Sequence, residues 1–154
     1  MSAISPASNK RTGINGLRAN SLAAVVMLVI EFALGVAVNL YSTLPSSDAG
    51  KTLLSAFGAA VTNGPVALTL HALLGTLLLI TGISAVVRAS LLRRGVPITV
   101  TGVALLAILL AWLAGTRFVG DSGNGESLVM ALATGVAIVC YAGILFGTAE
   151  LARA

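Results

Sequence analysis

Residues 21–44 read SLAAVVMLVIEFALGVAVNLYSTL, an apolar run that contains a single charged side chain, Glu31. About 20 apolar residues in a helix cross the hydrocarbon core of a bilayer, since a helix rises about 1.5 Å per residue. Lys10, Arg11 and Arg18 precede the run, as basic residues precede a secretory signal. The apolar part of such a signal has only about 7–15 residues, so we predict a retained membrane helix.

Three further apolar runs of spanning length follow the first. They cover residues 65–87, 96–115 and 127–148. The whole chain of 154 residues is 57% hydrophobic and 9% charged, and its mean hydropathy is +1.02. Soluble proteins have about 25% charged residues, and disordered chains have more polar compositions still. We therefore predict an all-α integral membrane protein in which residues 21–150 form one four-helix bundle.

The basic residues predict how the bundle is oriented. Seven of them flank or join the spans on one side and two lie on the other: Lys10, Arg11, Arg18, Arg88, Arg93, Arg94 and Arg153 against Lys51 and Arg117. Basic residues gather on the cytoplasmic side of membrane proteins. We expect both termini in the cytoplasm, with residues 1–20 as a cytoplasmic tail, and a multi-pass protein of a bacterial cytoplasmic membrane. With no dense basic stretch, the chain predicts no nucleic-acid partner.

The first outer loop, residues 45–64, carries an apolar stretch of its own. Leu53-Leu-Ser-Ala-Phe-Gly-Ala-Ala60 is too short to span a bilayer. We predict a short helix that lies at the outer interface or over the mouth of the bundle.

Glu31 and His71 are the two titratable side chains expected inside the membrane, where a charged group costs about 2.5–3.5 kcal/mol. Gly35 and Asn39 share the helix face of Glu31, and Gly75 shares the face of His71. From their positions in the spans we expect an offset of about 9 Å between Glu31 and His71, to be bridged by water or a third side chain. Tyr141, expected near the depth of Glu31, is a candidate donor to the carboxylate.

Three interpretations of this pair stay open. In the first, both groups are uncharged, because burial penalises the charged forms, and they hold the helices in register. In the second, Glu31, Asn39, His71 and Tyr141 bind a small ligand or a proton. In the third, His71 and Met130 ligate a haem, although a bis-histidine cytochrome needs two imidazoles and the chain has one. We expect no other cofactor and no metal site.

Aromatic and charged residues gather at the outer end of the third span. Trp112, Arg117 and Phe118 lie there, near Asp121 and Glu126. Such residues commonly form an interfacial belt. Alternatively, Trp112, Arg117 and Phe118 form an outward mouth above Asn39 and His71.

Short motifs carry a family resemblance. They are Glu31-Phe-Ala-Leu-Gly35, Asn39-Leu-Tyr41, His71-Ala-Leu-Leu-Gly75 and Ser127-Leu-Val-Met130. With these motifs the chain resembles uncharacterised four-span membrane proteins of high-GC Gram-positive bacteria, which implies the fold and no activity. An acidic residue in the first of four spans is also similar to the small multidrug-resistance transporters, where this residue exchanges protons for drugs. The long outer loop, His71 and the strong charge bias depart from that family.

These observations favour a binding or accessory membrane component with an outward-opening polar cavity, rather than an enzyme. We expect no catalytic residues, and the single cysteine, Cys140, excludes a disulfide-exchange enzyme, which needs a cysteine pair. The alternatives are a proton-coupled transporter that uses Glu31 and a b-type haem protein that uses His71. The expected partners are the lipid bilayer, a small-molecule ligand, and a second copy of the chain or a larger membrane complex.

Overall fold

The computed structural model describes residues 6–41, 52–121 and 124–153, and these residues form five helices. The helices are α1 (Pro6–Tyr41), α2 (Leu53–Thr62), α3 (Val66–Leu91), α4 (Gly95–Asp121) and α5 (Asn124–Arg153). Four of them are long enough and apolar enough to cross a membrane, over Arg11–Tyr41, Val66–Leu91, Gly95–Val119 and Asn124–Thr148. The predicted all-α, four-helix membrane fold is confirmed, and the chain is a multi-pass membrane protein.

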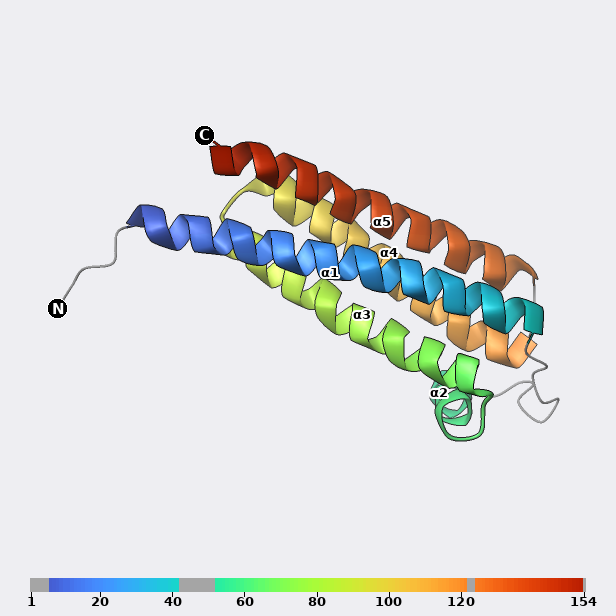
Figure 1. Cartoon of the computed structure of the whole chain (residues 1–154). Helices are drawn as coiled ribbons and strands as arrows, with labels where there is room; N and C mark the ends of the chain where they lie inside the picture. The colour runs from blue at the N-terminus through green and yellow to red at the C-terminus, as the bar shows by residue number, and fades with distance from the viewer. Residues whose placement is uncertain (1–5, 42–51, 122–123, 154) are drawn as a thin grey trace.

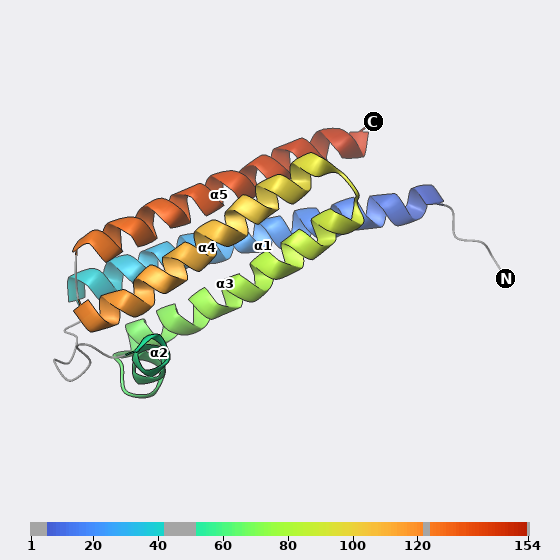
Figure 2. The ribbon, with the colours of Figure 1, turned by 180° about the vertical axis from the view of Figure 1, so that it is seen from behind.

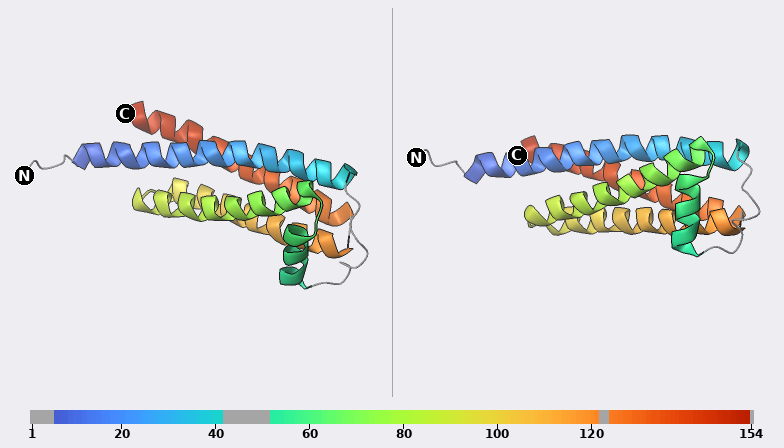
Figure 3. Two further views of the ribbon diagram at one scale, coloured as in Figure 1. Left: turned by 60° about the horizontal axis from the view of Figure 1, so that its bottom comes forward. Right: turned by 90° about the horizontal axis from the view of Figure 1, so that it is seen from below.

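The four long helices form a bundle in which each packs against two others. Helix α1 lies against α3 and α5, and α4 lies against the same two helices from the other side (Figure 1). The start of α1 and the end of α5 lie at the same end of the bundle, as Figure 2 also shows from behind. Helix α2 crosses the bundle at the opposite end and packs on α3 and α4 (Figure 3). We call this the α2 end.

Small side chains line the contacts between the long helices. The main core contains the fully buried alanines Ala24, Ala85, Ala104 and Ala137 together with larger residues such as Leu17 and Tyr141. Membrane helices associate through close backbone packing rather than through hydrophobic burial, because lipid is as apolar as leucine. Large side chains such as Leu22, Ile80, Leu106 and Val139 accordingly face outward.

A second, smaller apolar cluster lies under α2. It consists of Val38, Ala56, Ala60, Leu68 and Val119. The Thr69 hydroxyl donates a hydrogen bond of 3.0 Å to the Ala60 carbonyl and so fastens the last turn of α2 to α3. Helix α2 occupies the segment in which the sequence predicts a short helix, and residues 42–51 of that outer loop lie outside the described residues.

The long helices extend beyond the apolar runs. Helix α1 begins at Pro6, so most of the segment expected as a tail, residues 1–20, continues the first span as one helix. In this extension a Cβ at Gly16 would lie 2.7 Å from Nη1 of Arg88, so glycine lets the arginine pack close to α1. Hydropathy marks only the part of a helix that lies in lipid, and no proline stands where α1 continues from residue 21 back to Arg11 or where α3 continues past residue 87.

Candidate functional site

The candidate site is a cavity of about 240 Å³ between the main core and the α2 end. All five helices contribute to its wall. Of the eight residues predicted for the site, six line it: Glu31, Asn39, His71, Trp112, Phe118 and Met130. Most of the remaining wall is apolar, so the few polar groups that face the cavity determine what it can bind.

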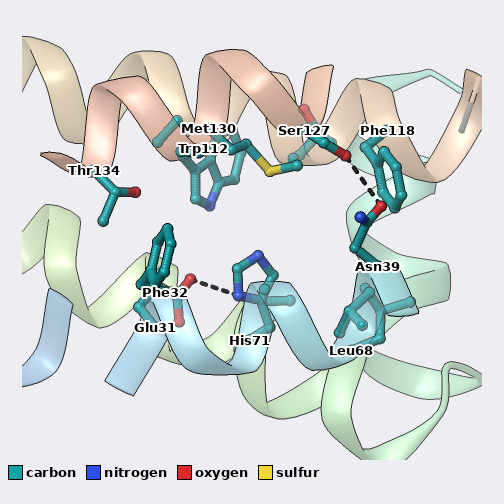
Figure 4. A pocket seen from close by; sticks show the side chains of 18 of the residues that line it. Glu31, Phe32, Asn39, Leu68, His71, Trp112, Phe118, Ser127, Met130 and Thr134 are labelled. Atoms are coloured by element: carbon teal, nitrogen blue, oxygen red, sulfur yellow. Dashed lines mark hydrogen bonds and ion pairs between the residues drawn. The ribbon is translucent and has the colours of Figure 1, made fainter. Parts of the chain in front are cut away.

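Glu31 and His71 are in direct contact. Nδ1 of His71 lies 3.0 Å from Oε1 of Glu31, and both side chains are largely buried (Figure 4). The predicted offset of about 9 Å is therefore wrong. It assumed that the spans start level, whereas α1 reaches past the beginning of α3 at the α2 end (Figure 1). Because α3 starts deeper in the bundle, His71 is carried down to Glu31.

Two glycines make room for this contact. A Cβ at Gly35 would lie 3.2 Å from Cε1 of His71, and a Cβ at Gly75 would lie 2.9 Å from Oε1 of Glu31. Each ionisable residue thus stands one helical turn before a glycine that receives its partner from the other helix. The glycines predicted on these two faces have this role: they let α1 and α3 exchange their polar side chains at close range.

The pair leaves hydrogen-bonding capacity unused. Oε2 of Glu31 is buried and has no hydrogen-bond partner among the described residues, and Nδ1 of His71 is close to Oε1 without a well-aligned hydrogen bond. The second ring nitrogen of His71 faces the cavity in Figure 4. Buried polar atoms in proteins are nearly always paired, so an unpaired carboxylate oxygen in a cavity wall requires an explanation.

Trp112 forms an aromatic wall beside the pair. Its indole Nε1 donates a hydrogen bond of 3.3 Å to the Thr76 hydroxyl, and its ring lies 5.7 Å from the ring of Phe57 on α2. Its Cδ1 would be 3.7 Å from a Cβ at Gly75, so the indole borders the space that holds the carboxylate. Trp112 lines the cavity, so it lies further inside the bundle than a residue of the predicted interfacial belt or outer mouth.

At the α2 end, Asn39 and Ser127 join α1 to α5. The Ser127 hydroxyl donates a hydrogen bond of 3.2 Å to Oδ1 of Asn39. Phe118 lines the cavity near this bond (Figure 4), whereas Arg117 is exposed and is not part of the wall. Of the three residues predicted at an outer mouth, two therefore line the cavity and one does not.

Tyr141 lies away from Glu31. It is fully buried in the main core, and its hydroxyl oxygen lies 3.5 Å from a Cβ placed at Gly82, about two turns further along α3 than Gly75. The structure therefore does not bring Tyr141 to the carboxylate. The bond between Asn39 and Ser127 sets α5 lower against α1 than the sequence estimate assumed, and this shift carries Tyr141 below the cavity.

Met130 lines the cavity, with its sulfur 3.3 Å from a Cβ at Gly115. Phe57, Thr116 and Thr134 also line the cavity, and nothing in the sequence singles them out, because single threonines and phenylalanines are ordinary in membrane helices. Within the described residues, no group of three or more His, Cys, Asp or Glu side chains lies close enough to hold a metal ion.

Comparison with known proteins adds nothing to this geometry. The chain matches no protein-family model, no curated protein and no solved structure. What the site does must therefore be argued from its own residues.

Proposed function

We propose that the protein binds a small molecule in this cavity and holds it against Glu31 and His71. The observation that carries the proposal is Oε2 of Glu31, which is buried and without a partner among the described residues, in a side chain that lines a cavity of about 240 Å³. An unpaired buried polar atom costs about 1–3 kcal/mol, and more when it is charged. A ligand that donates a hydrogen bond to this oxygen would offset that cost.

A purely structural role accounts less well for the same residues. Polar groups that only hold helices in register satisfy one another across the helix interface. Here the carboxylate keeps a free oxygen, and the imidazole turns a ring nitrogen toward the cavity (Figure 4). Gly35 and Gly75 are covered by His71 and Glu31 themselves, and the pair lines a cavity of about 240 Å³. Space together with free acceptors is the pattern of a binding site.

The charge bias of the sequence supports a position of this cavity in the outward half of the bundle. The turn between α3 and α4, with Arg93 and Arg94, lies opposite the α2 end, and basic turns stay in the cytoplasm. In a bacterial cytoplasmic membrane the site would therefore lie within the outer leaflet. A binding or accessory component of the membrane is the role that suits such a protein.

The direct experiment is to identify what the cavity holds. The protein is extracted from its membrane in polymer-bounded lipid discs, and native mass spectrometry compares wild type with Glu31→Gln and His71→Ala. Gly135→Ala is the matched control, since a Cβ at Gly135 meets nothing within 4 Å. We expect a small molecule in wild type and control that is lost from both site variants. The same small-molecule content in all four proteins would refute the proposal.

Proton-coupled transport is the second candidate, and the contact between Glu31 and His71 favours it. Two titratable groups 3.0 Å apart can pass a proton between them. This function predicts a pH-dependent flux of the identified molecule into proteoliposomes, and the flux disappears in Glu31→Gln. Binding without flux would support the binding function and contradict transport.

Haem ligation by His71 and Met130 makes a separate prediction. Both residues line the cavity, but a volume of about 240 Å³ favours a ligand smaller than a porphyrin. A Soret band in protein purified after haem-supplemented expression, lost in both His71→Ala and Met130→Leu, would support haem. Absence of the band would count against it.

A further inference from the structure

The cavity wall between α1 and α5 is also part of the outer surface of the bundle. Phe32 and Val36 both line the cavity, yet 48% of the surface of Phe32 and 42% of that of Val36 is exposed. Each of these side chains therefore has the cavity on one side and the surroundings of the bundle on the other. In a membrane-spanning helix those surroundings are lipid.

Helices α1 and α5 are held together on both sides of Phe32 and Val36 along the bundle. At the α2 end, Ser127 bonds Asn39. Phe32 lies seven residues before Asn39, and Thr134 lies seven residues after Ser127, so in antiparallel helices these two residues share a level (Figure 4). Below that level, Leu28 and Ala137 belong to the closely packed main core. We call the stretch from Phe32 and Thr134 up to Asn39 and Ser127 the α1–α5 seam.

Among the described residues, the α2 end is covered more fully than the seam. Helix α2 lies across it, and the buried cluster of Val38, Ala56, Ala60, Leu68 and Val119 fills the space beneath. Phe57 of α2 rests against Trp112 and adds a further apolar layer. A molecule that came from water along the bundle axis would have to displace this cluster. At the seam, by contrast, Phe32 and Val36 line the cavity and are themselves exposed.

We infer that the ligand enters the cavity sideways from the lipid, through the α1–α5 seam, and that it is an uncharged, lipid-soluble phenol or related ring alcohol. The inference rests on the proposed binding function. As a carboxylate, Glu31 can only accept hydrogen bonds at its unpaired oxygen, and the cavity-facing nitrogen of His71 accepts in the tautomer whose proton is on Nδ1, beside Oε1, so the proposed ligand is a donor. Phe32, Phe57, Trp112 and Phe118 supply aromatic walls for a ring.

Entry through lipid also favours some hydrogen-bond donors of the ligand over others. An ammonium group offers hydrogen bonds to the same acceptors, but a charged group is costly in hydrocarbon, by about 2.5–3.5 kcal/mol even on the lowest scales. A hydroxyl group is neutral and crosses the outer leaflet at a far smaller cost. An entrance from the lipid together with two acceptors therefore favours a hydroxyl on an apolar ring.

Trp112 is the only tryptophan in the chain, so its fluorescence reports occupancy of the cavity directly. The probe is a brominated alkylphenol, which quenches tryptophan, and the control is its methyl ether, which lacks the donor. Both are titrated into full-length protein in phosphatidylcholine nanodiscs. We expect saturable quenching by the phenol, at least tenfold weaker binding of the ether, and a similar loss in Glu31→Gln. Equal binding of phenol and ether would overturn the assignment of a hydroxyl ligand.

The route is tested by the rate of quenching after rapid mixing. Phe32→Ala should raise the association rate several-fold, and Val36→Phe should lower it. Leu22→Ala is the matched control, because Leu22 is an exposed residue of α1 outside the cavity wall and should leave the rate unchanged. Phe32→Leu repeats the test should the alanine variant be unstable. Quenching that depends on Glu31, with rates unchanged by all seam variants, would overturn entry through the seam and leave the binding function standing.

Discussion

At the scale of single residues, the molecule depends on a reciprocal exchange between α1 and α3. Glu31 stands one turn before Gly35, and His71 stands one turn before Gly75, and each side chain occupies the space that the glycine of the other helix leaves. Two ionisable groups are thereby brought into contact inside an apolar bundle. Either group alone would destabilise the bundle if it were charged, because an isolated charge in an apolar medium is strongly disfavoured.

The exchange predicts the effect of a single methyl group. In Gly75→Ala the new Cβ would lie 2.9 Å from Oε1 of Glu31, so the carboxylate has to move away from His71. We expect the variant to unfold at a lower temperature and to lose ligand. Gly135→Ala adds the same methyl where nothing lies within 4 Å, and the higher helix propensity of alanine should leave stability unchanged or slightly raised. Thermal unfolding of both in one detergent checks this, and equal midpoints would contradict the close fit.

For Tyr141 we predict the opposite effect on stability. Its hydroxyl is buried without a hydrogen-bond partner among the described residues, and it does not line the cavity. Tyr141→Phe removes an unpaired polar group and keeps the ring, so stability should stay equal or rise by up to about 1 kcal/mol. Chemical denaturation and the phenol titration together test this. A clear loss of stability or of binding would mean that the hydroxyl has a partner, as the sequence first suggested with Glu31.

At the scale of elements, α2 forms the wall of the cavity at the α2 end. It crosses α3 and α4, and through Phe57 it contacts the aromatic wall of the site. Its place at the end of the bundle also coincides with the deeper start of α3, which aligns His71 with Glu31. A short helix that is too short to span the membrane thus helps to set the geometry of a site between two long ones.

The contact of Phe57 with Trp112 can be followed by fluorescence. In Phe57→Ala the indole loses its neighbour at 5.7 Å, and water can approach it from the α2 end. We expect a red shift of the Trp112 emission and more quenching by iodide. Leu54→Ala changes an exposed residue of the same helix and should leave the spectrum unaltered. Identical spectra for both variants would show that α2 does not shield the site.

At the scale of the whole molecule, orientation determines what reaches the site. The charge bias predicts that Asn63, just after α2, lies outside the cell and that Ser90, near the end of α3, faces the cytoplasm. Both residues are exposed. In a Cys140→Ser background, Asn63→Cys should react with a membrane-impermeant maleimide in intact cells, and Ser90→Cys only after permeabilisation. The reverse pattern would invert the protein and move the cavity to the inner leaflet.

The number of spans and the titratable groups they contain could be read from the sequence. Glu31 and His71 stand out because insertion into lipid is judged residue by residue along a segment, and a charged group in such a segment is costly wherever the helix packs. The small residues Gly35 and Gly75 could be placed on the same faces by helical periodicity alone. Local properties of this kind require no knowledge of neighbouring helices.

The relative depth of the helices was decided only by the tertiary structure. Whether Glu31 touches His71 or Tyr141 depends on how far α3 and α5 slide along α1, and a shift of two turns moves a side chain by about 11 Å. Apolar periodicity determines which face of a helix a residue occupies. It does not determine how far one helix slides along another, because one apolar stretch packs about as well as the next. The sequence by itself therefore determined a four-span membrane protein with one carboxyl and one imidazole in its interior. Only packing brought these two groups together, through the level of α3 against α1, and left Tyr141 below them, at the level of α5 that the bond between Asn39 and Ser127 marks.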